Sequence, residues 1–103
     1  MYQIEFLSVA QQDLVDIVGY ISRDLSNPEA AEKLIERISK AVDSLKTFPY
    51  ANAVYNPAGQ LELEYRRIMV GKYVLFYSVH ELDKLVVITR VVYNGQKYDK
   101  LLG

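Results

Sequence analysis

The side chains best suited to chemistry in this sequence are arginines, tyrosines and a lysine within its last forty residues. If the strands predicted below pair as hairpins, these side chains lie near the ends of neighbouring strands and can converge. A tyrosine among them can accept a proton only if nearby cations lower its pKa from about 10. The candidate set is Arg66, Arg67, Arg90, Tyr93, Lys97 and Tyr98.

Arg90 is the most informative of these residues. It alternates with Val86, Ile88 and Val92, so it is expected to project from an otherwise apolar face. A charge in that position needs either a partner or an open cleft. Two interpretations therefore stay open: Arg90 is a site residue, or it is a strand-end arginine paired with a carboxylate such as Glu64 or laid over a tyrosine ring.

The two other arginines are neighbours in one predicted strand. Arg66 and Arg67 cannot point the same way in a regular strand, so we expect one to be solvent-exposed and the other to be the site candidate.

Other catalytic chemistry finds little support. The sequence has no cysteine and one histidine, His80, which excludes a thiol nucleophile and a zinc site built from several Cys or His. His80 adjoins a polar turn, where a solvated loop residue is favoured over a general base. The sequence holds no phosphate-binding loop, Gly-rich nucleotide signature, Gly-x-Ser-x-Gly turn or paired-carboxylate spacing. We expect no metal and no cofactor.

Three consecutive strands must position the arginines. Residues 85–92 are apolar at six of eight positions, which is typical of a central strand buried on both faces. Residues 73–79 precede it across a short polar turn at residues 81–84, and Gly71 suits a tight turn after a strand at residues 61–70. The alternation fails at residues 67–70, which predicts a bulge there.

The first half of the sequence predicts one strand and two helices. Tyr2, Ile4 and Phe6 alternate with polar residues, as in a half-buried strand. Ser8, with Gln11 three residues later, is expected to cap a helix. Asn27-Pro28 ends that helix and starts a second, which runs to Phe48-Pro49. The expected fold is a two-layer α+β domain with an N-terminal strand, an α-helical hairpin and a three-strand antiparallel meander, forming a four-stranded sheet.

Size and charge narrow the function. The 103 residues fit a single domain spanning 1–103, and the first residues lack the pattern of a signal peptide, so we expect a cytoplasmic protein with no membrane association. The net charge is −1; residues 1–63 carry 5 − 9 = −4 and residues 64–103 carry 7 − 4 = +3. Because a grip on many phosphates needs a strongly basic total, we expect no sequence-specific DNA binding by this chain alone.

Six segments, in order and with compatible spacing, resemble the RelE/ParE superfamily of bacterial type II toxins, closer to its ParE-like members. They are Ala10-x-x-Asp13-Leu14-x-x-Ile17-x-x-Tyr20-Ile21, Ala30-Ala31, Leu45-x-x-Phe48-Pro49, Tyr65-Arg66-Arg67, Tyr73-Val74-Leu75-Phe76-Tyr77-x-Val79 and Val87-Ile88-x-Arg90-Val91. The resemblance covers nearly the whole chain. It implies the fold expected above and a toxin that inhibits growth until a cognate antitoxin neutralises it.

The superfamily contains two mechanisms. Members similar to RelE cleave mRNA on the ribosome, for which the resemblance implies Arg67, Arg90, Tyr93 and Tyr98 as catalytic residues here. An arginine typically follows the aromatic residue that begins the third strand, but Val74 stands there, and a later basic position falls near Asn94. Both departures count against an enzyme.

Members similar to ParE instead poison DNA gyrase, and the sequence favours this target over the ribosome and mRNA. The implied target-binding residues are Arg66, Arg67, Arg90 and Lys97. The expected antitoxin-binding residues, on a strand edge and the basic half of the chain, are Tyr2, Ile4, Phe6 and Arg90. A non-toxic α+β binding module is the remaining alternative.

Overall fold

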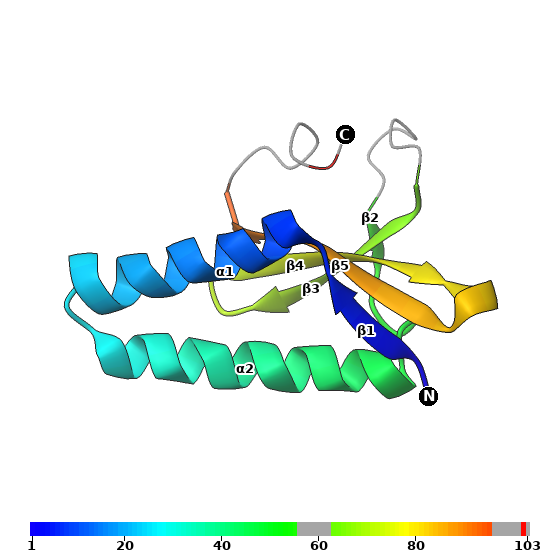
Figure 1. The fold of residues 1–103 in the computed structure, drawn as a ribbon, viewed down its shortest axis with the longest axis horizontal. Coiled ribbons are helices and arrows are strands. Elements are labelled where there is room, and N and C mark those ends of the chain that lie inside the picture. The colour runs from blue at the N-terminus through cyan, green and yellow to red at the C-terminus, as the bar shows by residue number, and fades with distance from the viewer. Residues whose placement is uncertain (56–62, 96–101, 103) are drawn as a thin grey trace.

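The computed structural model describes residues 1–55, 63–95 and 102, which form two helices and five strands (Figure 1). Helix α1 continues directly into a wide π-helical turn at Tyr20–Asp24. The elements follow in the order β1 (Gln3–Phe6), α1 (Ser8–Gly19), α2 (Pro28–Thr47), β2 (Val54–Tyr55), β3 (Tyr65–Val70), β4 (Tyr73–His80) and β5 (Leu85–Tyr93).

The strands form one sheet in the order β1-β5-β4-β3-β2. Strand β1 runs parallel to β5, and every other pair is antiparallel. The predicted α+β class is confirmed, but the prediction of four strands is wrong because β2 adds a fifth. This strand has two residues, which pair with Tyr65 and Arg66 of β3. Strand β4, rather than β5, occupies the centre of the order.

Local sequence signals explain where α2 begins but not how α1 does. The Asn27 side chain accepts a hydrogen bond from the backbone N–H of Ala30 at 3.1 Å, and Pro28 opens the helix, as predicted. Ser8 is instead the first residue of α1, and Leu7, with no side-chain cap, precedes it. The predicted cap at Ser8 is therefore wrong.

The two predicted tight turns are confirmed. Gly71 lies between β3 and β4 with a φ of +59°, a conformation that costs glycine little. A short 3₁₀ turn at Glu81–Asp83 joins β4 to β5, and Lys84 ends it in the left-handed region with a φ of 49°. His80 closes β4 rather than lying in the loop.

A bulge is present, but in β5 rather than in β3. Residues 66–70 pair with β4 without interruption, whereas Phe76 pairs with Arg90 and the next residue, Tyr77, pairs with Ile88. Thr89 therefore has no partner on β4, and the alternation of faces reverses there. The expectation that Arg90 shares a face with Val86 and Ile88 fails for this reason.

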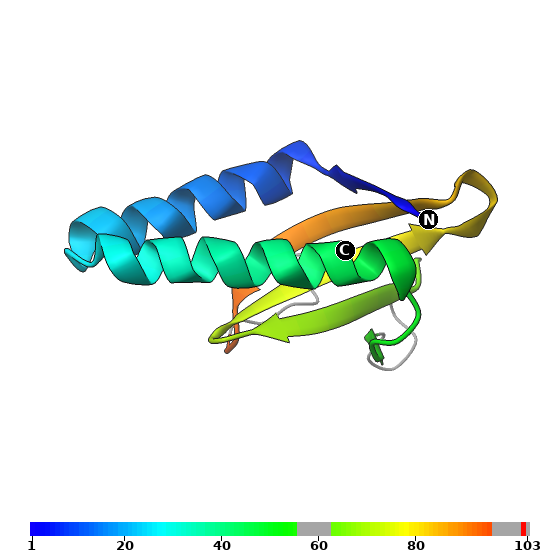
Figure 2. The ribbon, with the colours of Figure 1, turned by 90° about the horizontal axis from the view of Figure 1, so that it is seen from below.

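The sheet has apolar clusters on both of its faces. The larger cluster joins both helices to residues of β4 and β5, and Figure 2 shows α1 and α2 meeting at their connection and diverging away from it. A smaller cluster of Val74, Phe76 and Val92 lies on the other face, where Tyr55 and Leu102 pack. Tyr77, Phe76, Leu45, Leu75, Ile88, Val74, Val86 and Val91 are fully buried.

Candidate functional site

The best-defined polar contact among the candidate residues joins α1 to β5. Arg90 donates from Nε to Asp13 Oδ2 at 2.8 Å and from Nη2 to Asp13 Oδ1 at 2.9 Å. The same carboxylate accepts the backbone N–H of Val91 at 2.9 Å. The side chains of Arg90 and Asp13 are 20% and 13% exposed, so the pair is largely shielded from water. Hydrogen bonding to Asp13 raises the Arg90 pKa further above its usual value.

Asp13 provides a hydrogen-bond acceptor for the part of the β5 edge that β1 does not cover. The pairing of β1 with β5 ends at Ile88, whose carbonyl accepts the N–H of Leu7, and the chain then turns into α1. Beyond that point no described strand lies on this side of β5, so the Asp13 carboxylate accepts the Val91 N–H. Arg90 thus has the carboxylate partner that its sequence position required, but the partner is Asp13 and not Glu64.

Arg66 holds the segment that follows α2. Its guanidinium donates to the carbonyl oxygens of Tyr50 at 3.2 Å and Asn52 at 2.7 Å, and to Glu64 Oε1 at 3.3 Å. The same group lies 5.1 Å from the centre of the Tyr50 ring. Arg66 is therefore occupied by contacts within the protein, and it is Arg66, not Arg90, that forms an ion pair with Glu64.

Arg67 is the exposed member of the arginine pair. Its guanidinium lies 5.1 Å from the centre of the Tyr55 ring, and no carboxylate bonds to it within the described residues. Arg67 and Arg90 both pair with Phe76, so they stand at the same level on strands either side of β4. Arg66, one residue earlier, points to the other face.

The remaining candidates do not all meet the arginines. Tyr93 ends β5, and its ring packs edge-on against that of Tyr73 with 5.9 Å between ring centres. Because β3 and β5 run in the same direction, Tyr93 and Arg66 lie toward opposite ends of the sheet. Lys97 and Tyr98 lie outside the described residues. In the described ranges, no group of three His, Asp or Glu residues is arranged to hold a metal ion.

Of the four residues predicted for antitoxin binding, Ile4 and Phe6 lie on the edge strand β1, Tyr2 directly precedes it, and Arg90 lies on the interior strand β5. Within the described residues, β1 has a neighbouring strand on one side only, and Tyr2, Ile4 and Phe6 pack inward against the larger cluster. The outer backbone edge of β1 is therefore the surface available for pairing with another strand, whereas the three partly buried side chains mainly stabilise the fold.

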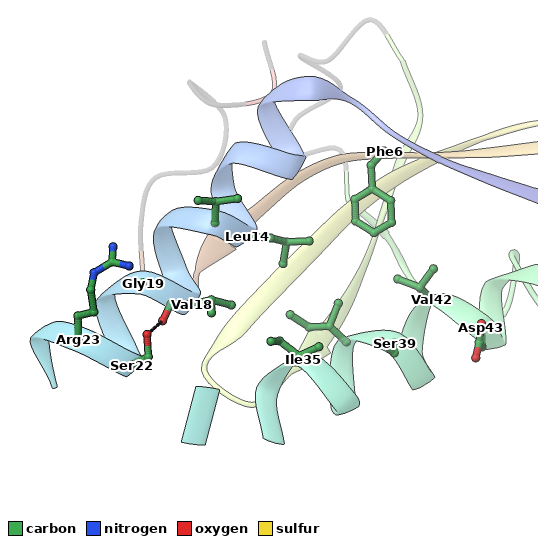
Figure 3. Close-up of a pocket in the computed structure, with 12 residues that line it drawn as sticks. Phe6, Leu14, Val18, Gly19, Ser22, Arg23, Ile35, Ser39, Val42 and Asp43 are labelled. Carbon is green, nitrogen blue, oxygen red and sulfur yellow. Dashed lines mark hydrogen bonds between the residues drawn. The ribbon is translucent and has the colours of Figure 1, made fainter. Parts of the chain in front are cut away.

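An apolar groove of about 570 Å³ lies between the two helices (Figure 3). Figure 3 shows Leu14 and Val18 on α1 facing Ile35 and Val42 on α2, with Phe6 projecting from β1 at one end of the groove. Polar groups stand at its margins, at Ser22, Arg23, Ser39 and Asp43. Such a trough matches the apolar face of an amphipathic helix.

The sequence prediction missed this groove, although a signal was present. Ile35 of α2 is 46% exposed and Val15 of α1 is 62% exposed, although both side chains are apolar. Val15 and Val18 add to the apolar face of α1 beside Leu14, which makes this face wider than packing against the sheet alone requires. The surplus apolar surface forms the groove.

A second missed feature gathers on the carboxylate of Glu81. Its Oε1 accepts hydrogen bonds from the hydroxyls of Tyr2 at 2.6 Å and Tyr50 at 2.7 Å, and Lys84 forms an ion pair with Oε2. These bonds, led by the one to Lys84, lower the Glu81 pKa from 4.5 to about 2. The bond to Glu81, followed by desolvation, raises the Tyr50 pKa from 10.0 to about 12. The cluster ties β1 to two distant turns.

Replacing Asp13 with Asn should destabilise the fold. The change removes the negative charge opposite Arg90 and weakens the bond to Val91, and we expect the free energy of unfolding to fall by about 2 to 3 kcal/mol. Asp16→Asn makes the same change on the exposed side of α1 and should cost less than about 0.5 kcal/mol. Urea unfolding followed by circular dichroism measures both, and equal losses would contradict the structural role of Asp13.

The Glu81 cluster predicts how stability depends on pH. Because the folded-state pKa is depressed, the Glu81 contribution is complete above its ordinary pKa of 4.5 and is lost as the pH falls through about 2. The Tyr50 contribution is complete below pH 10.0 and is lost as the pH rises through about 12. In denaturant titrations across the acid range, Glu81→Gln should flatten this decline, and a slope identical to that of the unaltered protein would refute the assignment.

Comparison with known proteins places this arrangement among toxins. The family described as "ParE toxin of type II toxin-antitoxin system, parDE" matches residues 4–98. A search of curated proteins gave no significant match. Within the described residues, neither helix is long and apolar enough to cross a bilayer.

Solved structures share the fold at low sequence identity. The chromosomal ParDE toxin–antitoxin system from P. aeruginosa aligns with a TM-score of 0.70 at 20% identity, covering 90% of this chain and 96% of that chain. The archaeal RelE–RelB complex from Pyrococcus horikoshii OT3 aligns with a TM-score of 0.61 at 22% identity, covering 93% and 98%. The toxin–antitoxin complex RelBE2 from Mycobacterium tuberculosis aligns with a TM-score of 0.60 at 20% identity, covering 89% and 96%. Because the family match spans nearly the whole sequence, this chain belongs to the ParE toxin family of type II toxin–antitoxin systems.

Proposed function

We propose that this protein inhibits growth by binding and poisoning DNA gyrase and that a cognate antitoxin neutralises it. Membership of the ParE toxin family supports the toxin role. The observation that carries the choice of target is the bond between Asp13 and Arg90, because it commits the arginine that RNA cleavage would use.

Phosphoryl transfer needs cations that are free to meet the charge developing on the phosphate. Here two of the three candidate arginines already bind internal acceptors, Arg90 at Asp13 and Arg66 at the carbonyls of Tyr50 and Asn52. Taking Arg90 away would leave the shielded Asp13 carboxylate without a cation and with only the Val91 N–H as a partner, at a cost of several kcal/mol. This commitment favours a binding protein over a nuclease.

The proposed gyrase contact centres on Arg67, which is exposed and lies over the Tyr55 ring, so here the exposed arginine is the site candidate, contrary to the sequence expectation. Arg66 and Arg90 act beside it by fixing the strands that flank β4. Lys97 stays in the proposed contact set, although it lies outside the described residues.

The proposed antitoxin surface combines the groove with the neighbouring edge of β1. The three solved structures compared above are described as toxin–antitoxin systems or complexes. An amphipathic antitoxin helix would bury the exposed side chains of Val15 and Ile35, and Phe6 connects the groove to β1. An extended segment leaving the groove could then pair with the free edge of that strand.

The gyrase assignment predicts loss of supercoiling in vitro. Purified gyrase acting on relaxed plasmid should lose activity or accumulate trapped cleavage complexes when this protein is added, while cell-free translation continues. Arg67→Glu should weaken inhibition at least about tenfold if it removes a contact worth about 1.4 kcal/mol. Lys40→Glu makes the same charge change on an exposed face of α2 and should leave inhibition intact.

The opposite pattern would support the alternative of a ribosome-dependent mRNA endonuclease, with which the RelE-containing structures are compatible. Arrested translation with unaffected gyrase would overturn the proposal and return Arg67, Arg90, Tyr93 and Tyr98 to the role of catalytic candidates. Activity in neither assay would favour a non-toxic binding module.

The groove assignment predicts selective loss of antitoxin binding. The double variant Val15→Glu, Ile35→Glu should fold, because both side chains are exposed, and should fail to co-purify with the antitoxin encoded beside the toxin gene. Leu82→Glu, on a fully exposed side chain outside the groove, is the matched control and should bind normally. Normal co-purification of the double variant would exclude the groove.

A further inference from the structure

Three cations gather at the end of the sheet where β3 turns into β4. Lys33 and Arg37 of α2 and Lys72 of the turn line a cavity of about 380 Å³. Its lining residues include no carboxylate. None of these three side chains forms an ion pair or hydrogen bond within the described residues.

The backbone brings these charges together at an electrostatic cost. Lys33 and Arg37 stand one turn apart on α2, a spacing at which like charges repel. Gly71 allows the β3–β4 turn to approach α2 so closely that a Cβ built on it would lie 3.1 Å from Arg37 Nη1. A bound anion would remove this repulsion, so the cluster is suited to one.

A second cavity, of about 540 Å³, adjoins the first and is lined by tyrosines. Tyr20, Tyr73 and Tyr93 contribute to its wall, and Lys72 and Tyr73 line both cavities. Burial, followed by the nearby hydroxyls of Tyr20 and Tyr93, raises the Tyr73 pKa, so the Tyr73 phenol stays neutral at physiological pH. Asp16 is the carboxylate on this wall and lies away from the cation cavity.

We propose that the two cavities together bind a nucleoside phosphate, either a free nucleotide or one unit of a single strand. The phosphate would sit among Lys33, Arg37 and Lys72, and the base would stack against the tyrosines. Asp16 would accept a hydrogen bond from a base amino group. An acidic peptide would satisfy the cations but would leave the tyrosine cavity unused.

This site is independent of the gyrase and antitoxin proposals. It shares no lining residue with the apolar groove and does not include Arg67. The proposal can therefore fail while the assignment of the target stands, and the reverse is also true.

Calorimetric titration of the full chain tests the phosphate half of the site. Adenosine and guanosine monophosphates should bind, and the double variant Lys33→Glu, Lys72→Glu should weaken binding at least about tenfold. Lys40→Glu lies on the same helix outside the cavity and should change binding less than about twofold. Equal weakening by Lys40→Glu, or no nucleotide binding at all, would overturn the proposal.

The tyrosine half is tested with ribose 5-phosphate, which has no base. Tyr20→Ala and Tyr93→Ala alter half-exposed rings and should weaken nucleotide binding about tenfold while leaving ribose 5-phosphate unchanged. A short single-stranded oligonucleotide that binds more tightly than the monophosphates would identify a nucleic-acid strand as the source, and equal affinities would identify a free nucleotide. A polyglutamate peptide that binds as tightly as the nucleotides would refute the assignment.

Discussion

The structure depends on one carboxylate that stands where a strand is missing. Strand β1 covers the edge of β5 only as far as Ile88, and the chain must then leave the sheet to form α1. Asp13 returns from that helix to bond the Val91 N–H and the Arg90 guanidinium. A buried strand edge with an unpaired N–H is unfavourable. The Asp13 side chain takes the place of the missing backbone carbonyl, so the chain can turn into a helix after a short strand while the N–H of β5 stays hydrogen-bonded.

The sequence predicted the long regular elements of the fold but not its short strand or its bulge. Strong periodicity identified both helices and the three long strands, and the turn residues Gly71 and Asn27 marked their connections. Strand β2 was not predicted because two residues are too few to show the alternation of apolar and polar side chains that identifies a strand. The bulge at Thr89 was not predicted because a single unpaired residue does not change the composition of the strand. The bulge reverses the face of the sheet to which each later residue of β5 points.

Prediction of the candidate site was limited by contacts between residues distant in sequence. The need of Arg90 for a carboxylate could be inferred, but the choice between Glu64 and Asp13 depended on how α1 crosses β5. The Glu81 cluster likewise draws its tyrosines from two remote segments. Charge and spacing thus indicate what a residue requires, whereas the topology decides which residue supplies it.

The pairing of the first strand with the last has a consequence for synthesis. Strand β1 and the apolar face of α1 leave the ribosome long before β5 exists, and Asp13 must wait for Arg90, 77 positions later. Closing so long a loop is entropically costly and slow, and the native sheet can form only after β5 has been synthesised. Incomplete chains would lack that closure and expose unpaired apolar surface to chaperones and proteases.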